Sequence, residues 1–142
     1  MLSGAAGQFY GNHYTWQFAD GWKDHLDTPG SAQLGYLVRL FTGLSWFRLV
    51  PDQAHRIVTD GYGRFSAAGN VGSSDYVTTA ATPDGTLAVS YLPAGGTVTV
   101  NLARFSRPVR ARWFDPTNGT FASLSSPWIV PSSPIGPCST GK

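Results

Sequence analysis

The feature that most constrains the fold is a series of short, strand-like segments between residues 54 and 124, separated by turn-forming residues. Residues 97–102 alternate polar and apolar side chains, which is typical of a strand with one buried and one solvated face. Residues 82–85, 93–96 and 115–119 place Pro, Asp and Gly as hairpin turns require. Strands are predicted at residues 56–59, 76–81, 86–92, 97–102, 109–114 and 120–124. Short strands with regular turns predict a mainly β fold, a small antiparallel β-sandwich.

The segment before these strands has a different pattern. Apolar side chains there recur at helical spacing, at Leu34, Leu37, Val38, Phe41 and Leu44. Thr28 can cap such a helix, Pro29 suits its first turn, and Gly43 suits its end. Residues 7–18 have no clean period, and their glycines and asparagine predict a loop. We therefore expect an N-terminal helical appendage on the β-sandwich.

These patterns divide the chain into three parts. Residues 1–53 form the loop-and-helix segment, and residues 54–124 form the β-sandwich domain. Residues 125–142 are rich in Ser and Pro and are predicted to form a loose tail.

Composition excludes several classes of partner. Charged residues make up 13% of the chain and the net charge is only +2, so a nucleic-acid partner is not expected. One group of cations clusters, and it is interpreted as a solvated face of a sheet: Arg104, Arg107, Arg110 and Arg112. Residues 1–10 contain neither a basic start nor a long apolar run, so no signal peptide and no membrane-spanning segment are expected.

The chain has few kinds of side chain that could carry out catalysis. All eight acidic residues are Asp, so acid–base chemistry by carboxylates has to use aspartate. The single cysteine, Cys138, excludes an intrachain disulfide and a cysteine zinc site. No Gly-x-Ser-x-Gly nucleophile motif is present.

Several motifs, taken in order, resemble one known family. Residues 10–13, Trp16, residues 26–30 and residues 46–52 are similar to the end of the barrel in apiosidase-like glycoside hydrolases. Residues 84–86, 91–96 and 112–116 are similar to the small C-terminal sandwich of those proteins, which is described as a collagen-binding domain. The resemblance covers residues 4 to about 121. It implies that the helical appendage derives from the end of a (β/α)8 barrel.

The resemblance also carries expectations about activity. The family's acid/base and nucleophile carboxylates lie on earlier barrel strands, so we expect a truncated chain without glycosidase activity of its own. The resemblance implies a secreted or periplasmic parent protein, while the localisation of this chain stays unknown. The loop after the last barrel strand lies at the substrate-binding face, which implies substrate-lining roles for Asn12, His13 and Trp16. Trp22 is a further candidate for stacking on a sugar ring. The alternative is that these side chains only pack within an aromatic loop.

A second cluster, Asp20, Asp24, His25 and Asp27, has the residue types that hold a hard cation. Calcium binds such carboxylate oxygens, although the spacing matches neither an EF-hand nor a zinc-binding helix. The alternative is a polar approach to the helix with a capping aspartate.

Three functions remain open from the sequence. The leading one is an ancillary module that binds a carbohydrate or another small molecule. The second is a small hydrolase of an ester or lactone that uses Asp, His and calcium, and the third is a purely structural module. A homo-oligomer is expected, because Trp16, Phe18, Leu34, Phe41 and Trp46 would leave a large apolar surface without the rest of a barrel.

Overall fold

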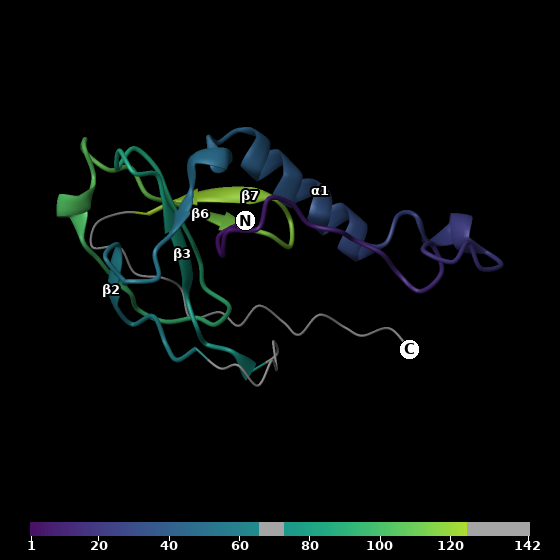
Figure 1. Cartoon of the computed structure of the whole chain (residues 1–142). Coiled ribbons are helices and arrows are strands. Elements are labelled where there is room, and N and C mark those ends of the chain that lie inside the picture. Colours follow the sequence, from purple (N-terminus) through teal and green to yellow (C-terminus); the bar gives the residue numbers. More distant parts are fainter. Residues whose placement is uncertain (66–72, 125–142) are drawn as a thin grey trace. The chain divides into compact units, whose positions relative to one another are not determined.

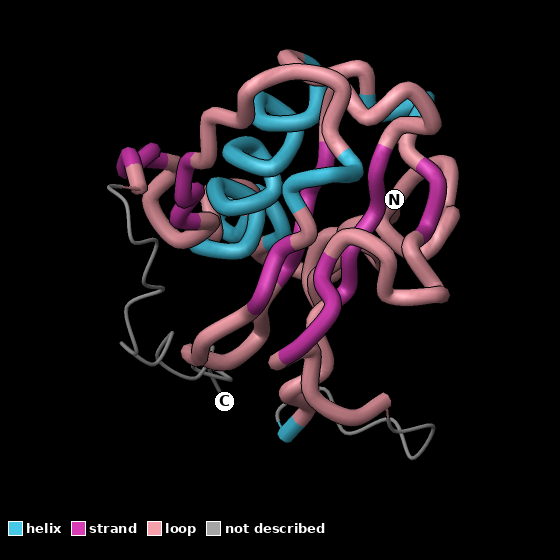
Figure 2. Tube along the Cα trace, turned by 90° about the vertical axis from the view of Figure 1, so that its left-hand side faces the viewer, coloured by secondary structure: helices cyan, strands magenta, loops and turns pink. Residues whose placement is uncertain are grey.

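The structure is a computed structural model that describes residues 1–65 and 73–124. This part of the chain contains one α-helix followed by seven strands, and all strand pairs are antiparallel (Figures 1 and 2). The expected mainly β fold with an N-terminal helix is confirmed, and the strands form small sheets that do not close into a barrel. No helix in the described ranges has the length and apolar character needed to cross a membrane.

The described residues separate into two compact units. The first unit comprises Ala5–Phe47 and Ala111–Leu124, and the second comprises Arg48–Arg110, where residues 66–72 are outside the description. The division into domains at residue 53 stays a prediction. The predicted tail, with Trp128 and Cys138, lies outside the described residues.

Helix α1 (Pro29–Thr42) begins and ends where the sequence predicts. The hydroxyl of Thr28 accepts a hydrogen bond from the backbone N–H of Ser31, and Gly43 follows the last helical residue. Phe41 is buried, but Val38, which belongs to the predicted apolar stripe, is 55% exposed. The rest of the stripe is half-buried. The helix is therefore amphipathic as predicted, except at Val38.

The β6–β7 hairpin belongs to the same unit as α1. Strands β6 (Arg112–Asp115) and β7 (Thr120–Ser123) pair antiparallel across the predicted turn. Gly119 has a left-handed φ of 74°, and a Cβ there would lie 2.8 Å from ring carbons of Tyr36 on α1. Only glycine suits both the conformation and the close approach. This contact places the hairpin turn against the helix (Figure 1).

The second unit contains a three-stranded sheet in the order β1-β3-β4. The pair β3 (Thr78–Ala81) and β4 (Ala88–Tyr91) is joined by residues 82–87, which include the predicted turn at residues 82–85. Strand β1 (Val50–Pro51), which the sequence analysis did not predict, pairs with β3. Because proline has no N–H to donate, it is tolerated at the sheet edge that β1 occupies.

Strands β2 (Val58–Asp60) and β5 (Thr99–Val100) form a separate two-stranded sheet. The predicted hairpin turn at residues 93–96 is therefore wrong, because it connects β4 to a strand of another sheet. The predicted strand at residues 97–102 is also too long: residues 102–104 form a 3₁₀-helix, η4 (Leu102–Arg104), and Leu102 is exposed. The buried apolar side chains of this unit come from both sheets and their flanks: Ile57, Val58, Val77, Ala80 and Leu92.

Candidate functional site

Asn12 organises the N-terminal loop of the first unit. Its side-chain oxygen accepts hydrogen bonds from the backbone N–H groups of Tyr14 and Thr15, at 3.0 and 2.9 Å. Its side-chain nitrogen donates to the backbone carbonyl of His25, 13 residues further on, at 3.0 Å. Asn12 thus closes a turn and ties it to the short 3₁₀-helix η1 (Trp22–His25). Its polar atoms hold the loop in shape.

Two histidines flank Tyr14 in this loop. The ring of His25 stacks on Tyr14 at 3.7 Å between centroids and an interplanar angle of 6°. The ring of His13 meets Tyr14 edge-on at 5.5 Å and 78°. His25 is half-buried, whereas His13 is exposed. Of the two imidazoles, that of His13 is therefore the more accessible to a ligand.

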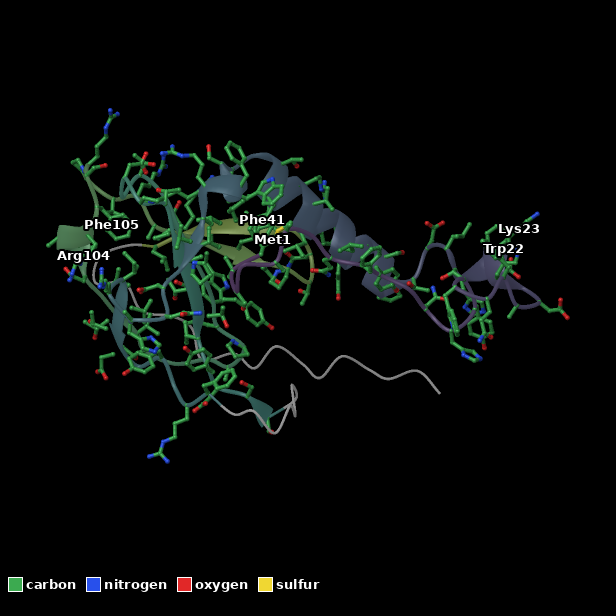
Figure 3. The ribbon with its side chains drawn as sticks, in the orientation of Figure 1. Met1, Trp22, Lys23, Phe41, Arg104 and Phe105 are labelled. Carbon is green, nitrogen blue, oxygen red and sulfur yellow. The ribbon has the colours of Figure 1, made fainter. Side chains whose placement is uncertain are left out.

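A hollow of about 400 Å³ lies beside η1, lined by residues 18–24. Phe18 and Trp22 meet edge-to-face there, with centroids 5.1 Å apart at 85°. Asp20, Lys23 and Asp24 complete the polar part of the lining. Trp22 and Lys23 extend from the same short helix (Figure 3), and the Lys23 ammonium lies 5.8 Å from the Trp22 ring centroid.

Phe18 has an unusual backbone for a bulky side chain. Its φ is +50°, in the left-handed region, and its side chain is 69% exposed. A left-handed conformation costs a non-glycine residue about 1–2 kcal/mol. The sequence analysis did not assign Phe18 to the site, because the strain is visible only in the folded backbone.

The sequence-predicted site residues are only partly brought together. Trp22, Asp20 and Asp24 line the hollow, but Asp27 does not. Trp16 is 67% exposed in the same loop. Within residues 1–65 and 73–124, no group of three or more Asp, His, Glu or Cys side chains is arranged to hold a metal ion. The calcium site at Asp20, Asp24 and Asp27 stays a prediction.

The loop is also joined to the beginning of α1. The hydroxyl groups of Tyr10 and Thr28 are 2.8 Å apart and form a hydrogen bond. A Cβ at Gly30 would lie 2.6 Å from the Tyr10 hydroxyl oxygen, so the phenol ring passes directly over this glycine. Two side-chain anchors, Asn12 and Tyr10, thus hold the loop.

The second unit contains an aromatic cluster that the sequence analysis missed. The ring of His55 stacks on Tyr62 at 3.7 Å and 6°, and Tyr76 meets His55 edge-on at 5.9 Å. Phe65 packs edge-on against Tyr76 at 5.5 Å and is exposed. His55 has a left-handed φ of 49°. These four residues come from different segments, and no local motif signals that they meet.

Three other aspartates serve turns. Asp52 accepts hydrogen bonds from the backbone N–H groups of Arg56 and Ile57. Hydrogen bonds from the side chains of Thr82, Thr86 and Arg48 hold the pKa of Asp84 well below its usual range. Thr117 and Asn118 lower the pKa of Asp115 in the same way. The lowered pKa values of Asp84 and Asp115 make these two carboxyl groups poor proton donors.

Comparison with known families agrees with the motif order. Residues 1–48 match the family described as "Apiosidase-like, catalytic domain". Residues 65–130 match the family described as "Putative collagen-binding domain of a collagenase". The chain matches the tail of an apiosidase-like catalytic domain followed by a collagen-binding-like domain. A search of curated proteins gave no match.

The two matches assign the structural features to segments. The hollow and both loop anchors lie in the apiosidase-like segment, which also contains α1. Phe65 and Tyr76 lie in the collagen-binding-like segment, whereas His55 and Tyr62 lie between the two matches. The resemblance inferred from the motifs is confirmed for both segments.

Proposed function

We propose that this chain is an ancillary, carbohydrate-interacting module related to glycoside hydrolases, without glycosidase activity of its own. The observation that carries the proposal is the hollow at residues 18–24, where two aromatic rings lie beside carboxylates within the apiosidase-like segment. Aromatic rings bind the apolar C–H faces of sugar rings, and carboxylates accept hydrogen bonds from sugar hydroxyls. The hollow offers both kinds of contact on one loop.

The predicted substrate-binding residues take different roles in this proposal. Trp22 contributes a ring to the hollow, and the exposed Trp16 extends the aromatic surface along the loop. The exposed imidazole of His13 can exchange a hydrogen bond with a sugar hydroxyl. Asn12 acts as a positioning residue, because its side chain is bonded to the loop backbone.

The proposed lack of glycosidase activity is argued from the chemistry that hydrolysis requires. A glycosidase uses two carboxyl groups that flank the scissile bond, one of which needs a raised pKa to act as acid. The resemblance implies that this pair belongs to other barrel strands than those in the segment that residues 1–48 match. Asp84 and Asp115 have lowered pKa values, which suits turn formation and not proton donation.

The first prediction concerns binding by the full chain. In NMR titrations with neutral oligosaccharides, we expect millimolar binding that perturbs the resonances of Trp22. Trp22→Ala should weaken binding about fivefold or more, because it removes about half of the aromatic surface. Phe9→Ala is the matched control, because it removes an exposed ring of the same unit outside the hollow. If the native chain binds none of the saccharides, the proposed function is wrong.

The hydrolase alternative predicts a different outcome for the same preparations. It requires that the native chain hydrolyses an ester or lactone, that a chelator abolishes this activity and that calcium restores it. It also requires that the activity is lost in Asp24→Asn or His25→Ala. We expect rates equal to those in buffer alone for all of these samples, and for aryl glycosides. Turnover that persists through purification and disappears with one of these substitutions would favour the hydrolase.

A further inference from the structure

The left-handed backbone at Phe18 positions one of the two aromatic rings of the hollow. A bulky side chain in the left-handed region is an outlier, whereas glycine adopts this conformation without penalty. Two backbone hydrogen bonds stabilise this conformation, from the N–H of Phe18 to the carbonyl of Thr15 and from the N–H of Ala19 to the carbonyl of Tyr14. The turn that they close sets the direction in which the exposed Phe18 side chain leaves the backbone, and Phe18 lines the hollow.

The orientation of Phe18 has a clear geometric consequence. Its ring stands at 85° to the ring of Trp22, so the two rings form the two sides of a corner. Gly21, with a φ of +80°, returns the chain between them, so both rings come from one short turn. A flat ring that stacks on one side of this corner meets the other side with its edge.

The charges of the lining point to the class of ring. Asp20 and Asp24 contribute two carboxylates to the hollow, and Lys23 contributes one ammonium group. The Lys23 ammonium is directed to the Trp22 ring, where a cation–π interaction engages it. The lining therefore has a net negative charge, which favours hydroxyl donors and repels a carboxylate on the ligand.

We propose that Phe18 is a ligand-contacting residue, and that the corner of Phe18 and Trp22 holds one neutral sugar ring whose hydroxyls donate to Asp20 and Asp24. The site discriminates against uronic acids, because a ligand carboxylate would lie among the protein's own carboxylates. This inference rests on the proposed carbohydrate-binding function and specifies its site and its selectivity.

The test separates the effect of the Phe18 ring on binding from the effect of its left-handed backbone on stability. Phe18→Gly relieves the left-handed conformation and removes the ring, so it should keep or raise the melting temperature while weakening the binding of methyl glucoside about fivefold or more. Phe18→Trp keeps a ring at the position and should bind at least as well as the native chain. Phe9→Ala is again the control, and should bind like the native chain.

Selectivity is tested with methyl glucuronide as the charged counterpart of methyl glucoside. We expect the native chain to bind the glucuronide about tenfold more weakly than the glucoside at low salt. A double variant that combines Asp20→Asn with Asp24→Asn should lose most of this difference in affinity. If the native chain binds the glucoside but Phe18→Gly binds it equally well, this inference is overturned and the proposed function stands. Equal binding of both ligands overturns the stated selectivity. If no saccharide binds, the proposed function itself fails.

Discussion

At the scale of single residues, three aspartates of the described ranges stabilise turns. Asp52, Asp84 and Asp115 each accept hydrogen bonds from groups within a few residues. Asp84 additionally accepts a hydrogen bond from the Arg48 guanidinium at 2.6 Å, in an ion pair that spans 36 residues of sequence. Asp20 and Asp24 differ from these because both line the hollow beside η1, next to two aromatic rings, which is why the hollow is the candidate site.

The pKa of Asp84 gives a prediction for the pH dependence of stability. Its folded-state pKa lies below the ordinary value of 3.8, so the folded chain binds fewer protons than the unfolded chain in the acid range. The stabilisation is therefore complete above about pH 5 and is lost as the pH falls through 3.8 towards the folded pKa. We expect Asp84→Asn to lower the melting temperature at pH 7 and to flatten its decline between pH 5 and pH 2.

The control for this prediction is Asp60→Asn, which removes an exposed carboxylate from strand β2. It should leave the acid decline close to that of the native chain. Calorimetry or circular dichroism at a series of pH values measures both variants. Identical acid profiles for Asp84→Asn and the native chain would contradict the role given to Asp84.

At the scale of elements, α1 offers a matched pair of glycines. Gly35 lies in the middle of the helix with open space around it, whereas Gly30 lies in the first turn beneath Tyr10. We expect Gly35→Ala to raise the free energy of unfolding by about 0.5–1 kcal/mol, because alanine is the better helix former. Gly30→Ala should lower it by about 0.5 kcal/mol or more, because the new methyl group displaces the Tyr10 hydroxyl from Thr28.

Urea denaturation of the two variants measures this difference. In a Tyr10→Leu background, Gly30→Ala should lose much of its penalty, because the obstructing phenol ring is gone. Equal gains from both alanines would show that Tyr10 does not lie over α1 in solution.

At the scale of the whole molecule, the exposed apolar side chains of the first unit bear on whether the chain self-associates. The sequence analysis placed Phe41 in this surface, but Phe41 is buried. Leu34 and Trp46 are half-buried. The exposed apolar side chains of the unit include Phe9, Trp16, Phe18, Leu26 and Val38. A surface of this kind favours self-association.

We therefore expect a dimer or larger assembly in sedimentation velocity at micromolar concentration. Val38→Lys should shift the assembly towards monomer, because it puts a charge on the exposed face of α1. Gln17→Lys adds the same charge at an exposed polar position and is the control. A native chain that sediments as a monomer would contradict the predicted oligomer.

The sequence by itself determined the features that depend on neighbouring residues. Thr28, Pro29 and Gly43 fixed the ends of α1, and the turns at residues 82–85 and 115–119 fixed two hairpins, because caps and turns are made by groups a few residues apart. The order of motifs likewise identified both family segments. Asn12, His13 and Trp16 were candidates because the family resemblance implied substrate-lining roles, and Trp22 was a candidate because of its aromatic side chain.

Only the tertiary structure decided which distant segments meet. Strand β5 pairs with β2 and not with β4, and His55 meets Tyr62 and Tyr76 across turns that carry no common motif. The strain at Phe18 and the corner it forms with Trp22 were equally invisible, because a sequence does not state the backbone conformation of a loop residue. Strand pairing, side-chain clusters and backbone strain arise from the competition of all segments for burial and hydrogen bonds. The local preference of a residue for helix, strand or turn does not reveal the outcome of that competition.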